Sequence, residues 1–503
     1  MPSAEGMRHF KQGITGLSQW TGRESKEVEK QLLPVIASIE TSNWDSDIVR
    51  LSRALLDFIY RAQASQMTDD DLGRLDSALA EFHQLKRVLI EMGVFENDAR
   101  FDYIAKLHMI GHMIRDTQQM GTPDGFSTES PEHMHIESKR AWRASNKVRP
   151  TPQMIKFIQR YEALRIHRSR LNTYLGRTTP EGGKRRTSHV VYGEDEEPFQ
   201  PACEVSVGHE ASGFAEEHSD KPGKGPNRAD ENSDSENDEE EDVDQVHFAG
   251  RMKTAADARR RVVYPNPTLS IALKPTAGKV RGLDIVTKYG ATALVPALHA
   301  YLKKHGTRKD FPRNFLPTAY HEYPVWHRLY LRHRALPFDP EWPRRDVIRA
   351  RPQDADHDEA FDVGLFLDRR REYGLARYRA GRVRAIFALP PTLQFLCPYP
   401  LVYVELFTSF SAAGSPFHGM HSLSHQLHPD GTRRSAVLSI FSLAAACHLA
   451  PQFRRLDPGL DLTSFPDLLS VSRYFWLNHY YNRFIFRLVE HWRFARDAAR
   501  NKQ

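Results

Sequence analysis

Apolar residues recur at every third or fourth position through residues 1–175, the spacing that one buried face of an α-helix requires. Thr21 and Glu24 have the spacing of a capping box and precede the run EVEKQLLPVIASI, so a helix is expected to begin there. Pro34 lies inside that run and predicts a kink or an early end. The same spacing predicts further helices at 46–64, from Thr68 to Gly93, and at 102–120, 132–145 and 152–175.

The pattern changes in residues 251–503. One helix is expected over LDIVTKYGATALVPALHAYLKKHG, at 283–306, and an aromatic-rich helix at the end of the chain. From Phe361 onward, apolar residues come in short runs separated by Pro and Gly, which is typical of strands. These runs are FDVGLFL, LARYRAGRVRAIFAL, PLVYVELFTSF, SAVLSIFSL and ACHLAPQF. The range is therefore predicted to be an α+β domain with a small sheet or barrel.

Residues 176–250 are rich in Gly, Pro, Ser and acidic residues and contain few aromatic residues. Such a composition cannot bury enough apolar surface to offset the entropy of ordering the chain. The sequence thus predicts an α+β protein in three parts: a helical domain at 1–175, a disordered acidic linker at 176–250, and a C-terminal domain at 251–503. Lys184, Arg185 and Arg186 in the linker either serve nuclear import or are a short basic run that arose by chance.

The charge of the chain is unevenly distributed. Its 70 Lys and Arg and 64 Asp and Glu give a formal net charge of +6, and ten of the acids lie between Asp230 and Asp244. Without that stretch the net charge would be +16. A basic body favours an anionic partner such as DNA, although surplus positive charge is also common on surfaces that only contact water.

The cysteines and the hydropathy narrow the class of protein. Cys203, Cys397 and Cys447 are far apart, which excludes a disulfide scaffold and a multi-cysteine zinc module and fits a reducing compartment. The chain has no run of about 18 apolar residues, and MPSAEGMRHFKQGITG has no apolar core of a secretory signal. We therefore expect a protein of the nucleus or otherwise the cytoplasm, not secreted and without a membrane partner.

The most distinctive stretch is GTPDGFSTESPEHMHIESKRAWRASNK, at 121–147. Glu129 and Glu132 lie where a turn leads into a predicted helix. Carboxylates at such a junction can converge with others on a pair of metal ions, as two-metal phosphoryl transfer requires. They can equally be acids that stabilise a helix N-terminus. Three cations follow on the predicted helix and are candidates for contacts with DNA phosphates: Lys139, Arg140 and Arg143.

Two further sets of residues are candidates for binding. His108 and His112 have the i, i+4 spacing that can hold a metal ion, although helix histidines are more often structural. The run RYRAGRVRAIF places Arg382 and Arg384 on one strand face, with two more arginines on the other side of Gly381, a glycine that could mark a bulge. Such a strand either follows DNA phosphates or presents a solvated basic face. The arginines of this set are Arg377, Arg379, Arg382 and Arg384.

Several long segments together resemble one family. In the first half these are SQWTGRESKEVEKQLLPVIA, ALLDFIYRAQ, LAEFHQLKRVLIEMGV, KLHMIGHMIRD and the stretch at 121–147. In the second half they are WHRLYLR, DVIRARP, RYRAGRVRAIFALPP, LVYVELFTSFS, ACHLAPQFRRLDP and LLSVSRYFWLNHYYNRF. The chain resembles the C-terminal portion of Plavaka-type transposases of mushroom-forming fungi, which are related to the Kyakuja-Dileera-Zisupton group and more distantly to CACTA elements.

This resemblance implies descent from a DDE transposase with an RNase H-like core, in which three acidic residues and two Mg²⁺ or Mn²⁺ ions cut and join DNA. In the family the first two aspartates lie upstream of the segments matched here, so one acid of three is expected in this chain. Glu129 is the first candidate and Glu132 the second. The resemblance thus implies a truncated transposase-derived protein that binds no metal by itself and retains DNA or protein binding. The alternatives are a subunit that completes the site of a transposase core chain, and a host-adopted interaction module.

Overall fold

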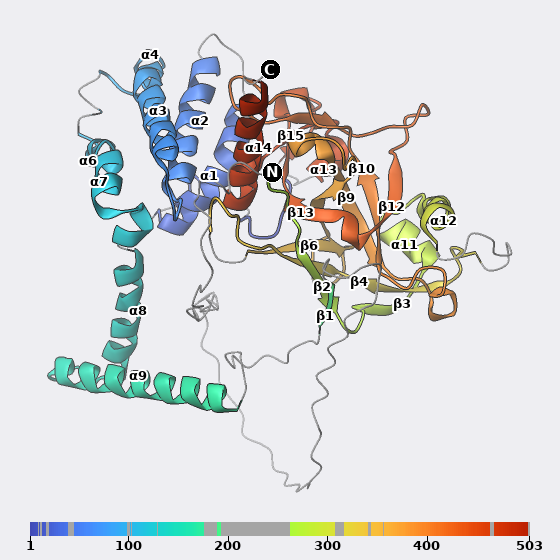
Figure 1. Cartoon of the computed structure of the whole chain (residues 1–503), viewed down its shortest axis with the longest axis horizontal. Helices are drawn as coiled ribbons and strands as arrows, with labels where there is room; N and C mark the ends of the chain where they lie inside the picture. Colours follow the sequence, from blue (N-terminus) through green and yellow to red (C-terminus); the bar gives the residue numbers. More distant parts are fainter. Residues whose placement is uncertain are drawn as a thin grey trace, which may run out of the picture. The chain divides into compact units, whose positions relative to one another are not determined.

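The computed structural model describes residues 1–8, 10, 13–16, 20–38, 45–97, 101, 103–127, 129–175, 189–192, 262–306, 316–340, 344–355, 357–462 and 467–500. The fold is α+β, with helices before residue 175 and antiparallel sheets with helices after residue 262 (Figure 1). Most of the expected linker at 176–250 lies outside the described residues. In the part of the chain that the structure describes, no helix is long and apolar enough to cross a membrane.

Local sequence signals account for the first helices. The Thr21 hydroxyl accepts a hydrogen bond from the backbone N–H of Glu24, whose carboxylate accepts from the backbone of Thr21, so the predicted capping box is confirmed. Thr68 and Asp71 form the same arrangement at the start of a later helix. A kink or an early end was expected at Pro34, and α1 ends at Ile36, two residues beyond it. The elements are α1 (Gly22–Ile36), α2 (Asp45–Ala62), α3 (Asp69–Leu85), α4 (Val88–Glu91), α6 (Ala105–Ile110), α7 (Met113–Met120) and η1 (Pro123–Phe126).

The contacts divide the chain into two compact units. One comprises Met1–Thr128, Thr187–Pro201 and Lys253–Gln503, and the other comprises Glu129–Arg186 and Ala202–Met252. In the second unit, α8 (Glu129–Ala144) packs against the 25-residue α9 (Pro150–Tyr174). This grouping differs from the expected ranges 1–175, 176–250 and 251–503, whose assignment to parts of a transposase stays a prediction.

In the described residues, the strands of the first unit form three antiparallel sheets. The largest has the order β12-β10-β9-β4-β3, with β8 between β9 and β13. A five-stranded sheet has the order β1-β2-β5-β6-β7, and a small one β11-β15-β14. The strands are β1 (His189–Tyr192), β2 (Thr268–Ala272), β3 (Ala277–Arg281), β4 (Glu322–Trp326), β5 (Arg328–Arg332), β6 (Arg345–Arg351), β7 (Ala360–Phe361), β8 (Val363–Leu367), β9 (Tyr378–Phe387), β10 (Leu401–Leu406), β11 (Ser422–Ser424), β12 (Ser435–Ser439), β13 (Leu443–Cys447), β14 (Leu449–Pro451) and β15 (Tyr474–Leu477).

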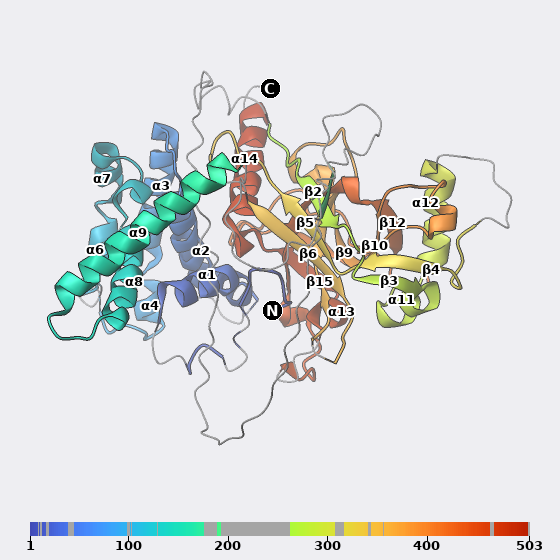
Figure 2. The ribbon, with the colours of Figure 1, turned by 90° about the horizontal axis from the view of Figure 1, so that it is seen from below.

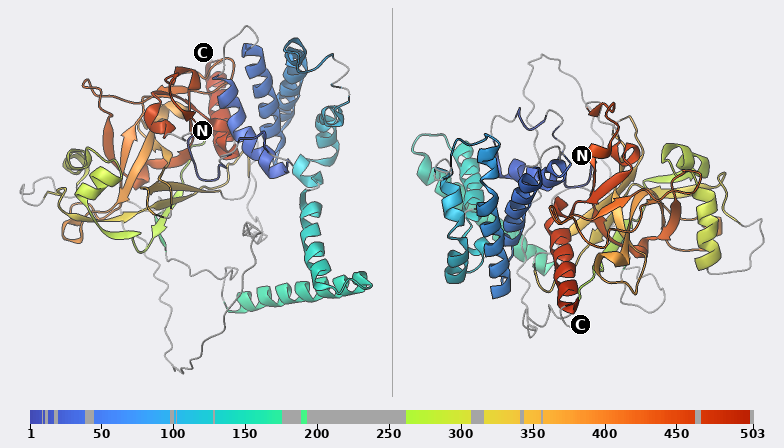
Figure 3. Two further views of the ribbon diagram at one scale, coloured as in Figure 1. Left: turned by 180° about the vertical axis from the view of Figure 1, so that it is seen from behind. Right: turned by 90° about the horizontal axis from the view of Figure 1, so that it is seen from above.

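The structure differs from the sequence-based expectations in several places. Five strands, β2 to β6, precede Phe361, where strands were first expected, and the helices expected at 68–93 and 102–120 are each divided in two. β1 lies inside the range expected to be disordered and pairs with β2 from His189↔Ala272 to Tyr192↔Leu269, because HVVY is a short β-branched and aromatic run that suits an edge strand. The helix expected at 283–306 is divided in two, since Gly290 has a φ of +70° that ends the first half. Figure 3 shows the resulting pair on the side of the sheets away from α14 (Arg483–Arg500). The remaining helices are α11 (Gly282–Lys288), α12 (Leu294–His305), η3 (Gly374–Arg377), η4 (Pro391–Leu393), η5 (Ile440–Ser442), η6 (Phe453–Arg455), α13 (Leu468–Val471) and η8 (His479–Tyr481).

The N-terminal helices pack directly on the C-terminal part of the chain. Figures 1 and 2 show α1 and α2 beside α14. Leu33, Leu56 and Tyr60 share one apolar cluster with Tyr480 and Phe486, which are more than 400 residues later in the sequence. The Tyr60 hydroxyl also donates to the backbone carbonyl of Tyr480. The helices α1 and α2 therefore fold as part of the same unit as α14.

Charged side chains join the same helices. The Arg61 Nε donates to Glu490 Oε1 at 2.7 Å, and Arg487 donates to the other oxygen of Glu490 at 2.7 Å. Asp57 accepts from the Tyr480 hydroxyl at 2.6 Å, and its second oxygen lies 3.6 Å from Arg61. These side chains are largely buried and have lost their contact with water. Their charged and hydroxyl partners replace that water.

Replacing Arg61 by Met should lower the free energy of unfolding by roughly 3–5 kcal/mol, because Glu490 and Asp57 would each lose a buried cation. Arg50→Met on the same helix is the matched control. Arg50 pairs with Asp47 and Glu81 only at the exposed surface, so its loss should cost about 0–1 kcal/mol. Chemical denaturation of both variants measures the difference, and equal losses would contradict a central role for the Arg61 pair.

Candidate functional site

The two candidate acids occupy the start of a helix. Glu129 is the first residue of α8 and Glu132 the fourth, so the predicted junction of turn and helix is confirmed for the backbone. The side chains of both residues lie outside the described residues. Their role as a third catalytic acid therefore stays a prediction, as does binding of Mg²⁺ or Mn²⁺ in a complete transposase.

The structure brings the two candidate histidines together. The Nε2 atoms of His108 and His112 lie 3.1 Å apart, on either side of the break between α6 and α7 at Gly111. In the described residues, no group of three or more His, Cys, Asp or Glu side chains is arranged to hold a metal ion. Metal binding by this pair stays a prediction, and the histidines could at most contribute two of its ligands.

Three of the four arginines lie on β9, which is central in its sheet, and the fourth, Arg377, is the last residue of η3. β9 pairs with β8 from Tyr378 to Arg382 and with β10 from Gly381 to Phe387, and most of its residues are buried. Arg382 is only 2% exposed, and both Arg382 and Arg384 pack over the Phe361 ring. The expected solvated face is therefore not found on this strand.

Each of these four arginines has a partner within the fold. Arg382 donates to Asp467 at 2.8 Å and to the Ser470 hydroxyl at 2.9 Å. Arg384 pairs with Glu405 at 3.2 Å, and Arg379 with Asp368 at 2.9 Å. Arg377 packs on the Tyr264 ring. A DNA-binding role for these four residues stays a prediction, but it would require DNA to replace partners that they already have.

The glycine of this strand has a different role from the expected bulge. The register of β9 on β10 shifts between the pairs Ala385↔Tyr403 and Val383↔Val404, which leaves Arg384 as the extra residue. Gly381 lies three residues earlier, in regular pairing with Leu406. A Cβ atom at Gly381 would lie 3.2 Å from the Phe366 ring, so glycine is favoured there by close packing.

The cations of α8 and α9 lie in a different environment. Lys139, Arg140 and Arg143, predicted as DNA contacts, are all exposed on α8. In residues 135–175 there are ten Lys and Arg, all exposed, against two acids, both near Arg165. The apolar spacing predicted the helix at 152–175, but no sequence motif singled out its cations. The cations beyond the three predicted ones are Lys147, Arg149, Lys156, Arg160, Arg165, Arg168 and Arg170.

Aromatic and apolar side chains lie among these cations. Phe157 and Tyr161 stack with ring centroids 6.4 Å apart, and Trp142 and Tyr174 are exposed. The link between the helices is held by the Gln153 side chain, which donates to Asn146 Oδ1 at 2.6 Å and to the Val148 carbonyl at 2.7 Å. The two helices thus present interleaved cations and rings, a combination found in surfaces that contact nucleic acids.

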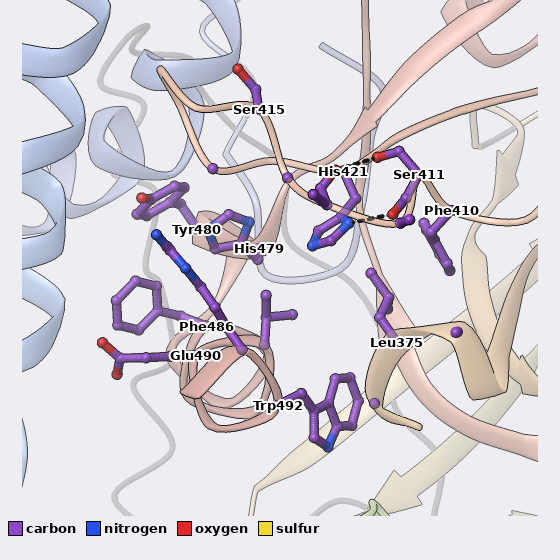
Figure 4. Close-up of a pocket in the computed structure, with 18 of the residues that line it drawn as sticks. Leu375, Phe410, Ser411, Ser415, His421, His479, Tyr480, Phe486, Glu490 and Trp492 are labelled. Carbon is purple, nitrogen blue, oxygen red and sulfur yellow. Dashed lines mark hydrogen bonds between the residues drawn. The ribbon is translucent and has the colours of Figure 1, made fainter. Parts of the chain in front are cut away.

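A cavity of about 370 Å³ opens in the first compact unit. Its walls come from α2, from residues 373–376, from the loop at 410–421, and from η8 and α14. Figure 4 shows His421 and His479 close together on one side, with Phe486 and Glu490 beside them and Trp492 and Leu375 across the opening. No sequence motif marked this cavity, because its residues come from four segments that are distant in the sequence.

The cavity combines apolar walls with positive charge. Asp57 and Glu490 line it, but their oxygens already accept bonds from Tyr480 and Arg61 and from Arg61 and Arg487. Burial, followed by the positive charges of His421, Arg53 and Arg493, lowers the pKa of His479 well below its ordinary value. The side chain of His479 is therefore neutral at physiological pH, in a region where the nearby charges are positive.

A second buried histidine lies beside the arginine strand. His425 Nε2 lies 2.8 Å from the Leu469 carbonyl, and its ring stacks on Phe407. Burial, with the nearby charge of Arg433, lowers the pKa of His425 from 6.5 to about 4. Between these two values the unfolded chain binds a proton that the folded chain does not, so the stability contributed by the neutral side chain is lost as pH falls from 6.5 to about 4.

We expect His425 to make the free energy of unfolding about 2 kcal/mol lower at pH 5 than at pH 7.5. The unchanged chain should therefore lose about 2 kcal/mol of its free energy of unfolding relative to His425→Gln as the pH falls from 7.5 to 5. His357→Gln, which changes an exposed histidine, is the control and should leave the profile unchanged. Urea denaturation at several pH values measures both, and a constant difference for His425→Gln would contradict the assignment.

In comparisons with known proteins, no protein-family model, no curated protein and no solved structure matches the chain.

Proposed function

We propose that the chain is a transposase-derived protein that binds DNA in the nucleus through the exposed surface of α8 and α9. The observation that supports this proposal is the set of ten exposed Lys and Arg against two acids in residues 135–175. In the first unit, by contrast, arginines such as Arg61 and Arg382 have carboxylate partners within 3 Å. An exposed surplus of cations is the feature that attracts a polyanion and releases its counterions.

The proposed binding does not depend on DNA sequence. The cations lie along a 25-residue helix, whose length of about 37 Å is comparable to one turn of B-DNA. Side chains such as Lys156 and Arg160 are suited to phosphates, which carry no sequence information. Phe157, Tyr161 and Tyr174 can add stacking to unpaired bases, so single-stranded DNA is a suitable partner as well.

A second function is favoured by one specific observation. Glu129 and Glu132 begin α8, on the same helix as Lys139, Arg140 and Arg143. If a transposase core chain supplied two aspartates, α8 could bring both a third acid and phosphate contacts to its site. The chain would then be a subunit of a complete enzyme. A host-adopted interaction module, the third alternative, would need neither DNA nor the acids.

Neutralising the cations of α9 should weaken DNA binding and reduce its salt dependence. We expect the triple variant Lys156→Gln, Arg160→Gln, Arg170→Gln to lower the slope of log K against log salt by about 0.9 for each phosphate that the protein no longer neutralises. The decrease in affinity should be similar on unrelated sequences. Fluorescence anisotropy with labelled duplex and single-stranded DNA at several salt concentrations measures it.

A matched triple variant in the first unit is the control. Lys303→Gln, Lys304→Gln, Arg332→Gln removes the same charge from exposed positions on α12 and β5. Its salt slope should be that of the unchanged chain. Equal effects of the two triple variants would indicate binding by net charge alone, and an affinity independent of salt would contradict the proposal.

We expect this chain alone not to cleave DNA that carries transposon terminal repeats, with Mg²⁺ or with Mn²⁺. The resemblance supplies only one of the three acids that hold the two metal ions. Cleavage products on denaturing gels provide the measurement, with and without an added transposase core fragment. Cleavage that appears only with the core and is lost in Glu129→Ala, but not in the α8 control Glu137→Ala, would favour the second function. Cleavage by the chain alone would overturn this prediction.

A further inference from the structure

The cavity between α2, the 410–421 loop and α14 has the size and lining of a small-molecule site. Its volume of about 370 Å³ lies within the range of about 300–1,000 Å³ that is usual for ligand pockets. Two glycines allow the tight turn of the loop that lines the cavity. A Cβ atom at Gly414 would lie 2.1 Å from the carbonyl oxygen of Gly419, and Gly419 has a φ of +71°. Side chains at these positions would disturb the turn of this loop.

The apolar residues that line the cavity suit a flat group between them. Phe486 lies beside the histidines and Trp492 and Leu375 lie across the opening, and Phe410 and Val489 also line the cavity. Trp492 is held in place, since its Nε1 donates to the Val263 carbonyl at 2.8 Å and its ring stacks on Tyr378. A preformed wall of rings and aliphatic groups favours an aromatic body over a flexible chain.

The polar side of the cavity suits an anion. Arg53, Arg61 and Arg493 line it, against the two acids Asp57 and Glu490. Asp57 pairs with Arg53 and Arg61 and accepts from Tyr480, and Glu490 pairs with Arg61 and Arg487. The three arginines of the lining outnumber its two acids, so the charge that faces the cavity is positive. Arg493 is exposed and is therefore accessible to a ligand.

A buried donor group faces the same space. His479 is only 6% exposed, and in the described part of the chain its Nδ1 makes no hydrogen bond. A buried polar atom without a partner has a cost in free energy that a ligand can remove. Figure 4 shows the imidazole of His479 at the side of the cavity, beside that of His421.

We propose that this cavity binds a small aromatic anion, with its ring against Phe486 and Trp492 and its carboxylate or phosphate toward His479 and Arg493. The shared chemistry is one anionic group on a flat body, and a nucleotide or an aromatic acid could supply it. The proposal goes beyond DNA binding and does not depend on it, because the cavity belongs to the first unit and the cations of α9 to the second.

Isothermal titration of the full chain with matched pairs of compounds tests the proposal. The pairs are deoxyadenosine monophosphate with deoxyadenosine, and indole-3-carboxylate with indole. We expect at least one anion to bind, with its neutral counterpart about tenfold weaker or more, because a hydrogen bond to a charged group is missing. Preference for the phosphate or for the carboxylate identifies the source. No binding of either anion at millimolar concentration would overturn the proposal.

Two variants locate the bound anion. Arg493→Gln should weaken binding about tenfold or more, since it removes the exposed cation of the cavity. Ala413→Trp should abolish binding by filling the space, and its unfolding curve reports whether the fold is kept. Arg332→Gln, an exposed arginine of β5, is the control and should bind as the unchanged chain does. If Arg493→Gln binds normally, the anion lies elsewhere and the proposal is wrong.

The α9 triple variant separates this proposal from DNA binding. Lys156→Gln, Arg160→Gln, Arg170→Gln should leave the affinity for the small anion unchanged, while it lowers the affinity for DNA. Loss of both affinities in this variant would assign the anion to the surface of α9 and overturn the cavity site.

Discussion

The buried carboxylates of Asp57 and Glu490 are the constraint on which the first compact unit depends. Each must accept hydrogen bonds within the fold, because a buried charge without partners costs several kcal/mol. Arg61 on α2 and Tyr480 and Arg487 near the C-terminus supply these bonds. Arg487 continues the network to Asp339, which also pairs with Arg483 at 2.7 Å. Helices from the start and the end of the sequence are thereby joined to a loop near its middle.

The same network shapes the cavity. Asp57 pairs with Arg53 and Arg61, and Glu490 pairs with Arg61 and Arg487, while Arg493 adds a further cation at the exposed edge of the cavity. Arg53 also donates to the Pro416 carbonyl at 3.0 Å, so α2 positions the 410–421 loop as well. Stability and the shape of the cavity are therefore coupled here. Substitutions of Arg61 that weaken the fold would also disturb the cavity, whereas Arg493, at its exposed edge, can be changed without that cost.

Much of the fold was predictable from local signals. Thr21 with Glu24 and Thr68 with Asp71 specify the starts of α1 and α3, because capping depends on neighbouring residues alone. The strand runs from Phe361 onward were predicted by their β-branched and aromatic composition. Pro34 lies in the last turn of α1, where its missing N–H removes only one backbone bond, and the helix ends two residues later. The division of the chain into units was not predictable from composition, since the pairing of Tyr60 with Tyr480 is visible only in three dimensions.

The two sets of arginines show why charge alone did not identify a binding surface. RYRAGRVRAIF and the basic helix at 152–175 each contain four arginines, yet Arg382 is buried and Arg160 is exposed. The difference lies in their neighbours. β9 is paired on both sides, and Asp467 and Glu405 lie within reach of its cations. In residues 135–175 the only two acids are near Arg165, so most of the positive charge meets the solvent. A cation contributes to recognition of a polyanion only where the fold has not already neutralised it, and in this chain that condition favours α8 and α9 over β9.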